Sequence, residues 1–360
     1  DYFSASLPMV QMGLTTSMIG LALGQIFFGP LSDKYGRRPL LLVSMLLFIV
    51  STLFCLFAPD IYSFVTLRLI QGIAGAGGIV ISRSVAIDKF SGKELAKMLA
   101  VIGAINGVAP VAAPVIGGLL TGSVGWQGIF MILLFIGILL GIGCIRFKES
   151  LPAEKRSKTG VWATFRSFGI IVHNRRYMLY VFQLAFAQGI LFAYIASSPF
   201  IIQQHYGFSP FAFSICFAVN AVAIGVAAAL SVKFRRTENG TLTGCVGMLV
   251  FAVLQMAALY SGCGFWTYEL LMFALLFMMG LTFTASTTLA MDCERRYAGA
   301  ASALLGALCF ASGGIVSPLV GLGDILISTG VTFVICAVCS LLCALWAVKR
   351  TGPKVALCRI

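Results

Sequence analysis

The chain has 360 residues, of which 59% are hydrophobic and only 10% are charged, and its mean hydropathy is +1.00. This composition excludes a soluble globular protein of ordinary make-up. The formal net charge of +13 does not indicate a nucleic-acid partner, because the cations lie in short segments between apolar runs and not on one amphipathic face. The composition therefore predicts a polytopic membrane protein.

Continuous apolar runs divide the chain into spans. Each run is long enough to cross a hydrocarbon core of about 30 Å as a helix, and the absence of alternation argues against a transmembrane β-barrel. Residues 1–8 resemble the late part of a further span, so we expect an all-α fold of twelve helices whose first helix, with the loop after it, is incomplete in this sequence. The eleven other expected spans are 10–30, 38–58, 61–85, 95–120, 126–146, 176–202, 210–233, 242–261, 268–291, 298–321 and 325–348.

The distribution of cations predicts the topology. Five connections carry no Lys or Arg, whereas the segments on the other side hold nearly all 25. By the positive-inside rule, the basic segments and both termini are cytoplasmic. The five connections without Lys or Arg are Pro59–Asp60, Thr121–Gly125, Gln203–Ser209, Ser261–Thr267 and Leu322–Asp324.

A basic segment at the midpoint divides the chain into two six-helix halves, residues 1–146 and 176–360, joined by a linker at 147–175. Two such bundles are typical of parallel-repeat transporters, whose substrate site lies near the bilayer midplane between the halves. We interpret the linker as a solvated basic loop on anionic lipid in preference to a partner-binding element.

The most distinctive stretch is Gly29-Pro30-Leu31-Ser32-Asp33-Lys34-Tyr35-Gly36-Arg37-Arg38, between the first two complete spans. We expect a tight turn here: Gly29 lets the two helix ends approach, Pro30 stops intrahelical bonding, and Gly36 supplies a backbone conformation that bulkier residues resist. The cations place the turn in the cytoplasm. A generic anchored turn is the alternative.

This stretch resembles the signature G-x-L-x-D-x-x-G-R-R/K of the major facilitator superfamily. The resemblance implies a charge network that includes Asp88, near Arg83, and the start of the eleventh helix, at Tyr297–Gly306. Such a latch would join the halves and hold the outward-open state, with Asp33 near the positive end of that helix. The predicted latch residues are Gly29, Asp33, Gly36, Arg37, Arg38 and Asp88.

Arg68 is the one Lys or Arg well inside an expected span. A guanidinium at that depth must face the bundle interior and find a carboxylate, a carbonyl or water, although it could serve only as a clamp between helices. Arg68-Leu69-Ile70-Gln71-Gly72 resembles the superfamily motif R-x-x-Q-G, which is associated with proton coupling. Asp1 is its expected partner, because a carboxylate at low dielectric beside an arginine can gain or lose a proton.

Two further resemblances indicate drug export. The segment from Asp1 and Tyr2 to Leu7-Pro8 partly matches the D-x-Y-L-P-x-L-P element of bicyclomycin and chloramphenicol resistance transporters. The fifth span combines helix breakers with small residues, which predicts a kinked, closely packed helix and resembles the motif of drug:proton antiporters. The residues expected at this kink are Gly107, Pro110, Pro114, Gly117 and Gly118.

Polar and aromatic side chains in the seventh span are candidates for a substrate pocket, and Ser198-Pro199-Phe200 again resembles the drug exporters. Isolated polar residues in membrane helices also serve as interhelical hydrogen bonds, so that alternative stays open for each. The candidate substrate residues are Tyr2, Gln71, Gln183, Phe186, Tyr194 and Ser197.

Together the resemblances imply a monomeric proton-coupled multidrug antiporter of a bacterial inner membrane, which exports amphipathic antibiotics of the phenicol or bicyclomycin type. Aromatic residues such as Phe130, Phe186 and Phe192 would supply apolar walls. An uptake symporter for a sugar or small metabolite is the alternative on the same fold. We expect neither an enzyme nor a passive channel, no cofactor and no metal, because the eleven cysteines are scattered through apolar runs without metal-ligand spacing.

Overall fold

The computed structural model describes residues 7–90, 92–156, 168–231, 234, 236–294 and 298–349. Their regular secondary structure is entirely helical, which confirms the all-α fold class for this part of the chain. The helices are α1 (Leu7–Tyr35), α2 (Arg37–Leu56), α3 (Ile61–Lys89), α4 (Gly92–Arg146), the 3₁₀ turn η1 (Ala153–Lys155), α6 (Arg175–Pro199), the π-helical turn η2 (Phe200–His205), α7 (Pro210–Ser231), α8 (Thr237–Tyr260), α9 (Phe265–Cys293), α10 (Ala298–Leu319) and α11 (Ile325–Lys349).

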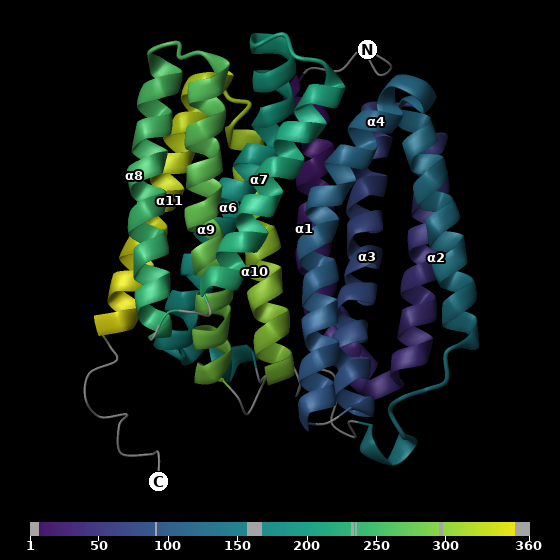
Figure 1. The fold of residues 1–360 in the computed structure, drawn as a ribbon. Coiled ribbons are helices and arrows are strands. Elements are labelled where there is room, and N and C mark those ends of the chain that lie inside the picture. Colours follow the sequence, from purple (N-terminus) through teal and green to yellow (C-terminus); the bar gives the residue numbers. More distant parts are fainter. Residues whose placement is uncertain are drawn as a thin grey trace.

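The helices form two sets that stand side by side (Figure 1). In the first set, α3 packs against α1 and α2, and α2 packs against α4. In the second set, α6 contacts α9, α10 and α11, while α9 also contacts α7 and α8. The sets meet where α1 packs against α10 and α4 packs against α7, so these four helices form the interface between the sets.

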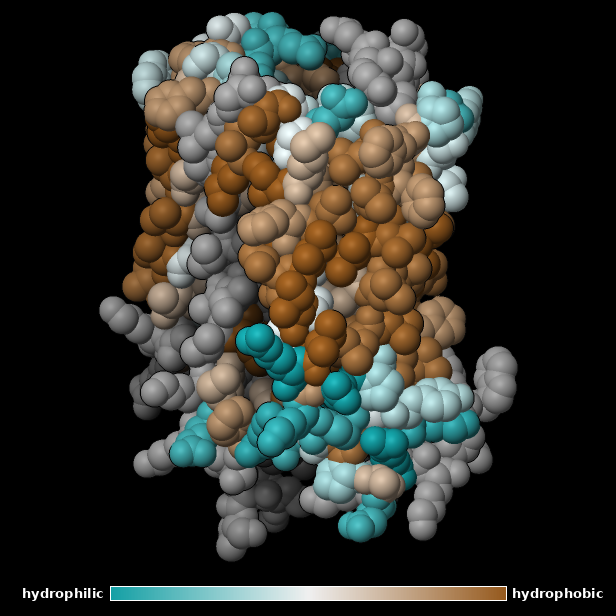
Figure 2. Space-filling model, turned by 90° about the vertical axis from the view of Figure 1, so that its right-hand side faces the viewer, coloured by the Kyte–Doolittle hydropathy of each residue, from teal (hydrophilic) through white to brown (hydrophobic). Residues whose placement is uncertain are grey.

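Ten helices of the described residues are long and apolar enough to cross a membrane, which makes the chain a multi-pass membrane protein. Figure 2 shows a broad apolar band on the outside of the first set, above a cluster of hydrophilic side chains. The apolar residues exposed on α2 and on the second half of α4 include Val43, Leu46, Phe54, Met131, Phe135 and Leu139. We call the end of the molecule that carries the α1–α2 turn the basic end.

The α1–α2 turn is much shorter than expected. α1 continues through Gly29 and Pro30 to Tyr35, and α2 begins at Arg37. The expectation that Pro30 stops the helix is therefore wrong, because neighbouring groups in a membrane bundle can satisfy the carbonyl that a proline leaves free. The special backbone of Gly36 is confirmed: its φ of +101° makes it the whole turn.

One expected boundary differs from the structure, and another agrees with it. Leu7 and Pro8 belong to α1 and do not end a separate span. The connection expected at 121–125 is confirmed: α4 consists of two helices that meet at Gly125, where φ is 64° and ψ is −177°. Figure 1 shows that α4 turns back on itself. The backbone stays helical through Gly107, Pro110, Pro114, Gly117 and Gly118, so the kink predicted there remains a prediction.

The helices of the first set approach closely where small residues meet. A Cβ atom added to Gly20 of α1 would lie 2.9 Å from the backbone nitrogen of Ile73 and would also overlap Leu69 and Gly72 on α3. Without a hydrophobic driving force between helices in lipid, such close backbone contact is a main source of association. It holds α3, and with it Arg68, against α1.

Candidate functional site

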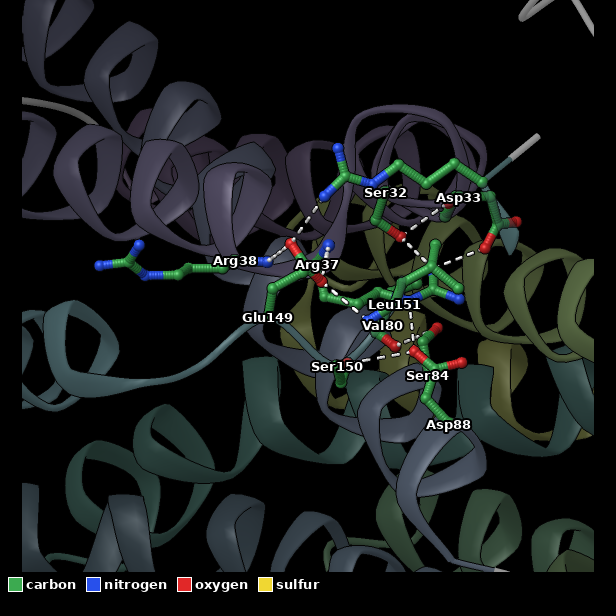
Figure 3. A network of polar contacts seen from close by, with 12 residues as sticks. Ser32, Asp33, Arg37, Arg38, Val80, Ser84, Asp88, Glu149, Ser150 and Leu151 are labelled. Atoms are coloured by element: carbon green, nitrogen blue, oxygen red, sulfur yellow. Dashed lines mark hydrogen bonds and ion pairs between the residues drawn. The ribbon is translucent and has the colours of Figure 1, made fainter. Parts of the chain in front are cut away.

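Arg37 is the centre of a charged network at the basic end (Figure 3). Its buried guanidinium donates from Nε to Asp88 Oδ2 at 2.9 Å and from Nη1 to Asp33 Oδ1 at 2.5 Å. Nη1 also donates to Ser32 Oγ at 2.6 Å, and Ser32 in turn donates to the carbonyl of Gly29 at 2.8 Å. These charge-assisted bonds join the end of α1, the start of α2 and the end of α3.

Glu149, which sequence reasoning missed, caps the first turn of α2. Its carboxylate accepts the backbone N–H groups of Arg37 at 3.0 Å and of Arg38 at 3.2 Å, and it forms an ion pair with Arg156 at 3.6 Å. Burial alone would raise the pKa of Glu149, but donors from Leu151, Arg37 and Arg38 and the charge of Arg156 hold that pKa below its ordinary value. The sequence signal for this role is that a helix beginning at Arg37 has free N–H groups in its first turn, and these groups need acceptors.

The structure brings the six predicted latch residues together, but the contacts described for them lie within the first helix set and the segment after α4. Asp88 accepts a further bond from Ser150 Oγ at 3.1 Å, and Arg38 Nη2 donates to the carbonyl of Ile145 at 2.9 Å. The hydrogen bond to the second set comes from Arg83, whose Nη1 donates to Ser302 Oγ on α10 at 3.1 Å. Tyr297, in the segment proposed as the partner of Asp33, lies outside the described residues.

Arg68 lies inside the first set among neutral groups. Its guanidinium contacts the side-chain oxygen of Gln71, donates to the carbonyl of Gly13 on α1 at 3.4 Å, and stands 5.8 Å from the ring centre of Phe130. Gln71 donates to Thr52 Oγ1 on α2 at 2.7 Å, which extends the chain of polar contacts. Among the described residues no carboxylate pairs with Arg68. The expected partner Asp1, like Tyr2, lies outside them.

The candidate substrate residues of α6 differ in their burial and in their contacts. Gln183 is buried and donates to Ser340 Oγ on α11 at 3.1 Å, and Ser197 Oγ donates to the carbonyl of Ala193 in its own helix at 2.8 Å. The bond of Gln183 matches the interhelical role left open as its alternative, whereas that of Ser197 stays within α6. Tyr194 is buried and stacks on Phe217 of α7 with ring centres 5.0 Å apart, while Phe186 is only partly buried.

Sequence reasoning also missed Glu269, because it lies at the edge of an expected span, where a carboxylate can reach water. In the structure it is partly buried one turn into α9, and it accepts a hydrogen bond from Asn220 on α7 at 2.8 Å. The same Asn220 nitrogen donates to the Tyr194 hydroxyl at 3.0 Å. An asparagine in the middle of the apolar run 210–233 was the sequence signal for this cluster.

Comparison with known protein families agrees with the helical fold and with the motif at the α1–α2 turn. The family model described as the Major Facilitator Superfamily matches residues 1–318. The chain belongs to this superfamily. It is therefore a membrane transporter and not an enzyme, and the resemblance drawn from the α1–α2 turn is confirmed.

The relatives of this major facilitator transporter include proteins named for drug resistance. It is 38% identical to the "Uncharacterized MFS-type transporter YdgK" of Bacillus subtilis over 89% of this chain and 81% of that protein. It is 29% identical to the "Bicyclomycin resistance protein homolog" of Haemophilus influenzae over 86% of this chain and 79% of that protein. A solved structure of a bacterial homolog to the human lysosomal transporter Spinster superposes with a TM-score of 0.74 and 18% identity, over 97% of this chain and 91% of that one, which shows the shared fold.

Proposed function

We propose that this major facilitator transporter exports amphipathic antibiotics in exchange for protons. The observation that carries the proposal is Arg68, a guanidinium within a membrane-spanning helix that the described residues surround only with neutral groups. A charge at that depth is expensive, and such residues typically lie on ion or substrate pathways. A protonatable carboxylate opposite Arg68 would pair with the guanidinium and so couple the charge of the site to proton binding.

Asp1 is the carboxylate that we assign to this role. When Asp1 is ionised it would pair with Arg68, and when it takes up a proton that pairing would weaken. A drug that enters a cavity between the two helix sets and a proton that binds Asp1 would then compete for the pair formed by Asp1 and Arg68. Such competition is the physical basis of antiport.

The two helix sets would supply alternating access. We assign residues 1–146 and 176–360 to the two halves, which meet along the contacts of α1 with α10 and of α4 with α7. The bond from Arg83 to Ser302 would hold the two sets together at the basic end, which we assign to the cytoplasm by the positive-inside rule. The charged network around Arg37 would keep α1, α2 and α3 together at that end. Rupture of the bond between the sets would open a cavity to the cytoplasmic side.

The substrate class is supported by the surroundings of Arg68 and by one relative. Phe130 beside Arg68 forms an edge-on aromatic cluster with Phe64 and Trp126, at ring-centre distances of 5.5 and 5.9 Å. Apolar walls with a few polar groups such as Gln71 suit a neutral or weakly charged amphipathic drug. A protein named as a bicyclomycin resistance homolog, alike over most of its length, suggests bicyclomycin as the first compound to test, and the resemblance of the sequence to chloramphenicol resistance transporters adds the phenicols.

Flux through proteoliposomes tests the proposal. With an imposed pH gradient, the unmodified protein should move drug against its own gradient towards the acidic side, and Asp1→Asn should abolish gradient-driven movement. Arg68→Lys should be poorly active because an ammonium lacks the planar fork, whereas Arg236→Lys, at an exposed position before α8, serves as the matched control. Movement of drug and protons in the same direction would instead indicate a symporter, and drug movement indifferent to the gradient would reject proton coupling.

A further inference from the structure

A second polar cluster within the membrane-spanning helices lies in the second helix set, at the end opposite the basic end. It consists of Glu269 on α9, Asn220 on α7 and Tyr194 on α6. α9 runs from this end towards Cys293 near the basic end, so Glu269, four residues after Phe265, belongs to its first turns. The cluster is separate from Arg68, which lies in the first set.

The hydrogen bonds of this cluster are incomplete. Asn220 Nδ2 donates to Glu269 Oε1 at 2.8 Å and to the Tyr194 hydroxyl at 3.0 Å. The second carboxylate oxygen of Glu269, Oε2, and the Asn220 oxygen, Oδ1, are both buried and have no hydrogen-bond partner among the described residues. Both of these atoms are acceptors, and no donor of the described residues reaches either of them.

The surrounding groups do not supply a positive charge. The titratable groups that face Glu269 are Tyr194 from α6, Cys216 from α7 and Tyr268 from α9 itself. Beyond Tyr268 lies Tyr206, with ring centres 5.7 Å apart. Among the described residues no Lys, Arg or His forms an ion pair with Glu269. An ionised carboxylate here would hold an uncompensated charge inside the membrane.

We propose that Glu269 is a proton-binding site. Binding forms one O–H bond on Oε2, removes the negative charge and turns this unpaired acceptor into a donor, and release breaks that bond and returns the proton to water. Because Oε2 and Asn220 Oδ1 have almost no accessible surface, a proton fits the site, whereas a hydrated metal ion or an organic ammonium group does not. Proton binding by Glu269 does not depend on the proposed function. The exchange of this proton for drug does rest on it.

Infrared difference spectroscopy of the full chain in lipid tests proton binding without transport. At a pH of about 6, exposed carboxyl groups are ionised, so we expect a protonated carboxylic acid C=O band that shifts in D₂O. The band should be lost in Glu269→Gln and kept in Glu154→Gln, which changes an exposed carboxylate, and in Asp1→Asn. Asn220→Ala should shift the frequency of the band, because Asn220 donates to Oε1 of the same carboxyl group.

The outcomes separate this inference from the proposed function. A spectrum unchanged by Glu269→Gln, in protein whose amide bands show an intact fold, would overturn the inference even if drug:proton exchange is measured. Loss of the band in Glu269→Gln would support it even if no exchange is found, in which case the proposed antiport fails alone. If the band is lost in Glu269→Gln and drug:proton exchange is also measured, Glu269→Gln should reduce the number of protons moved per drug.

Discussion

Arg83 on α3 donates a hydrogen bond to Ser302 on α10 at 3.1 Å, and this bond ties the two helix sets together at the basic end. A hydrogen bond to a charged group contributes about 1.5–3 kcal/mol. Ser302→Ala should therefore shift the population more than about tenfold towards states with an open basic end. Distances between spin labels on the basic ends of the two sets would measure the shift.

The control for that prediction is Ser312→Ala on the same helix, because Ser312 Oγ donates to the carbonyl of Cys309 within α10 at 2.7 Å. It removes a hydroxyl but no bond between the sets. If both variants leave the distance distribution unchanged, the bond from Arg83 to Ser302 does not hold the basic end closed.

Asp88 and Asp33 both bind Arg37, but they should differ in their effect on stability. The Asp88 side chain is 13% exposed, whereas that of Asp33 is 46% exposed. Removal of one partner from a buried ion pair costs about 3–5 kcal/mol, while an exposed pair contributes about 0.2–1 kcal/mol. Thermal unfolding in detergent should show Asp88→Asn much less stable than Asp33→Asn. Equal losses would mean that exposure does not set the strength of these bonds.

Asp33→Asn should also affect transport if Asp33 contacts α10 when the basic end is closed. Turnover should fall while drug affinity for a given conformation stays the same, because Asp33 is remote from the cavity proposed around Arg68. Drug binding and transport rates measured on the same preparation would show this. Intact transport with unchanged label distances would leave the α1–α2 turn as a topological anchor.

Glu149 should make the basic end sensitive to acid. Because its folded pKa lies below the ordinary value of 4.5, its bonds stabilise the fold above that pH, and the stability is lost as the pH falls through the folded pKa. The melting temperature of the unmodified protein should therefore decrease below pH 4.5 more steeply than that of Glu149→Gln. Parallel curves for the two proteins would show that Glu149 does not control this response.

Gly36→Ala should destabilise the turn for two reasons. The φ of +101° is unfavourable for alanine, and the added Cβ would meet Arg156 Nη2 at 2.9 Å as well as Glu149 Oε2. A strained backbone position costs about 1–3 kcal/mol. Gly207→Ala, at a φ of +73° with no atoms near the added Cβ, is the matched control. Unfolding curves should show the larger loss for Gly36→Ala, and the reverse order would argue against the contact with Glu149 and Arg156.

Much of the fold follows from local features of the sequence. Hydropathy indicates the spans because any helix in lipid must be apolar for about 20 residues, whatever its neighbours are. The left-handed backbone at Gly36 follows from steric freedom at a single residue. For the same reason the short motif around Gly29–Arg38 sufficed to indicate the superfamily.

The partners of the polar groups were decided by the tertiary structure. Glu149 binds the backbone of Arg37, 112 positions away, and Arg83 binds Ser302, 219 positions away. α1 passes through Pro30 because the bundle tolerates it, although local rules stop a helix there. Asn220 and Glu269 face each other only because α7 and α9 pack together. Hydropathy and turn preference act between near neighbours in the chain, whereas a hydrogen bond needs atoms about 3 Å apart in space, and only the packed helices set those distances.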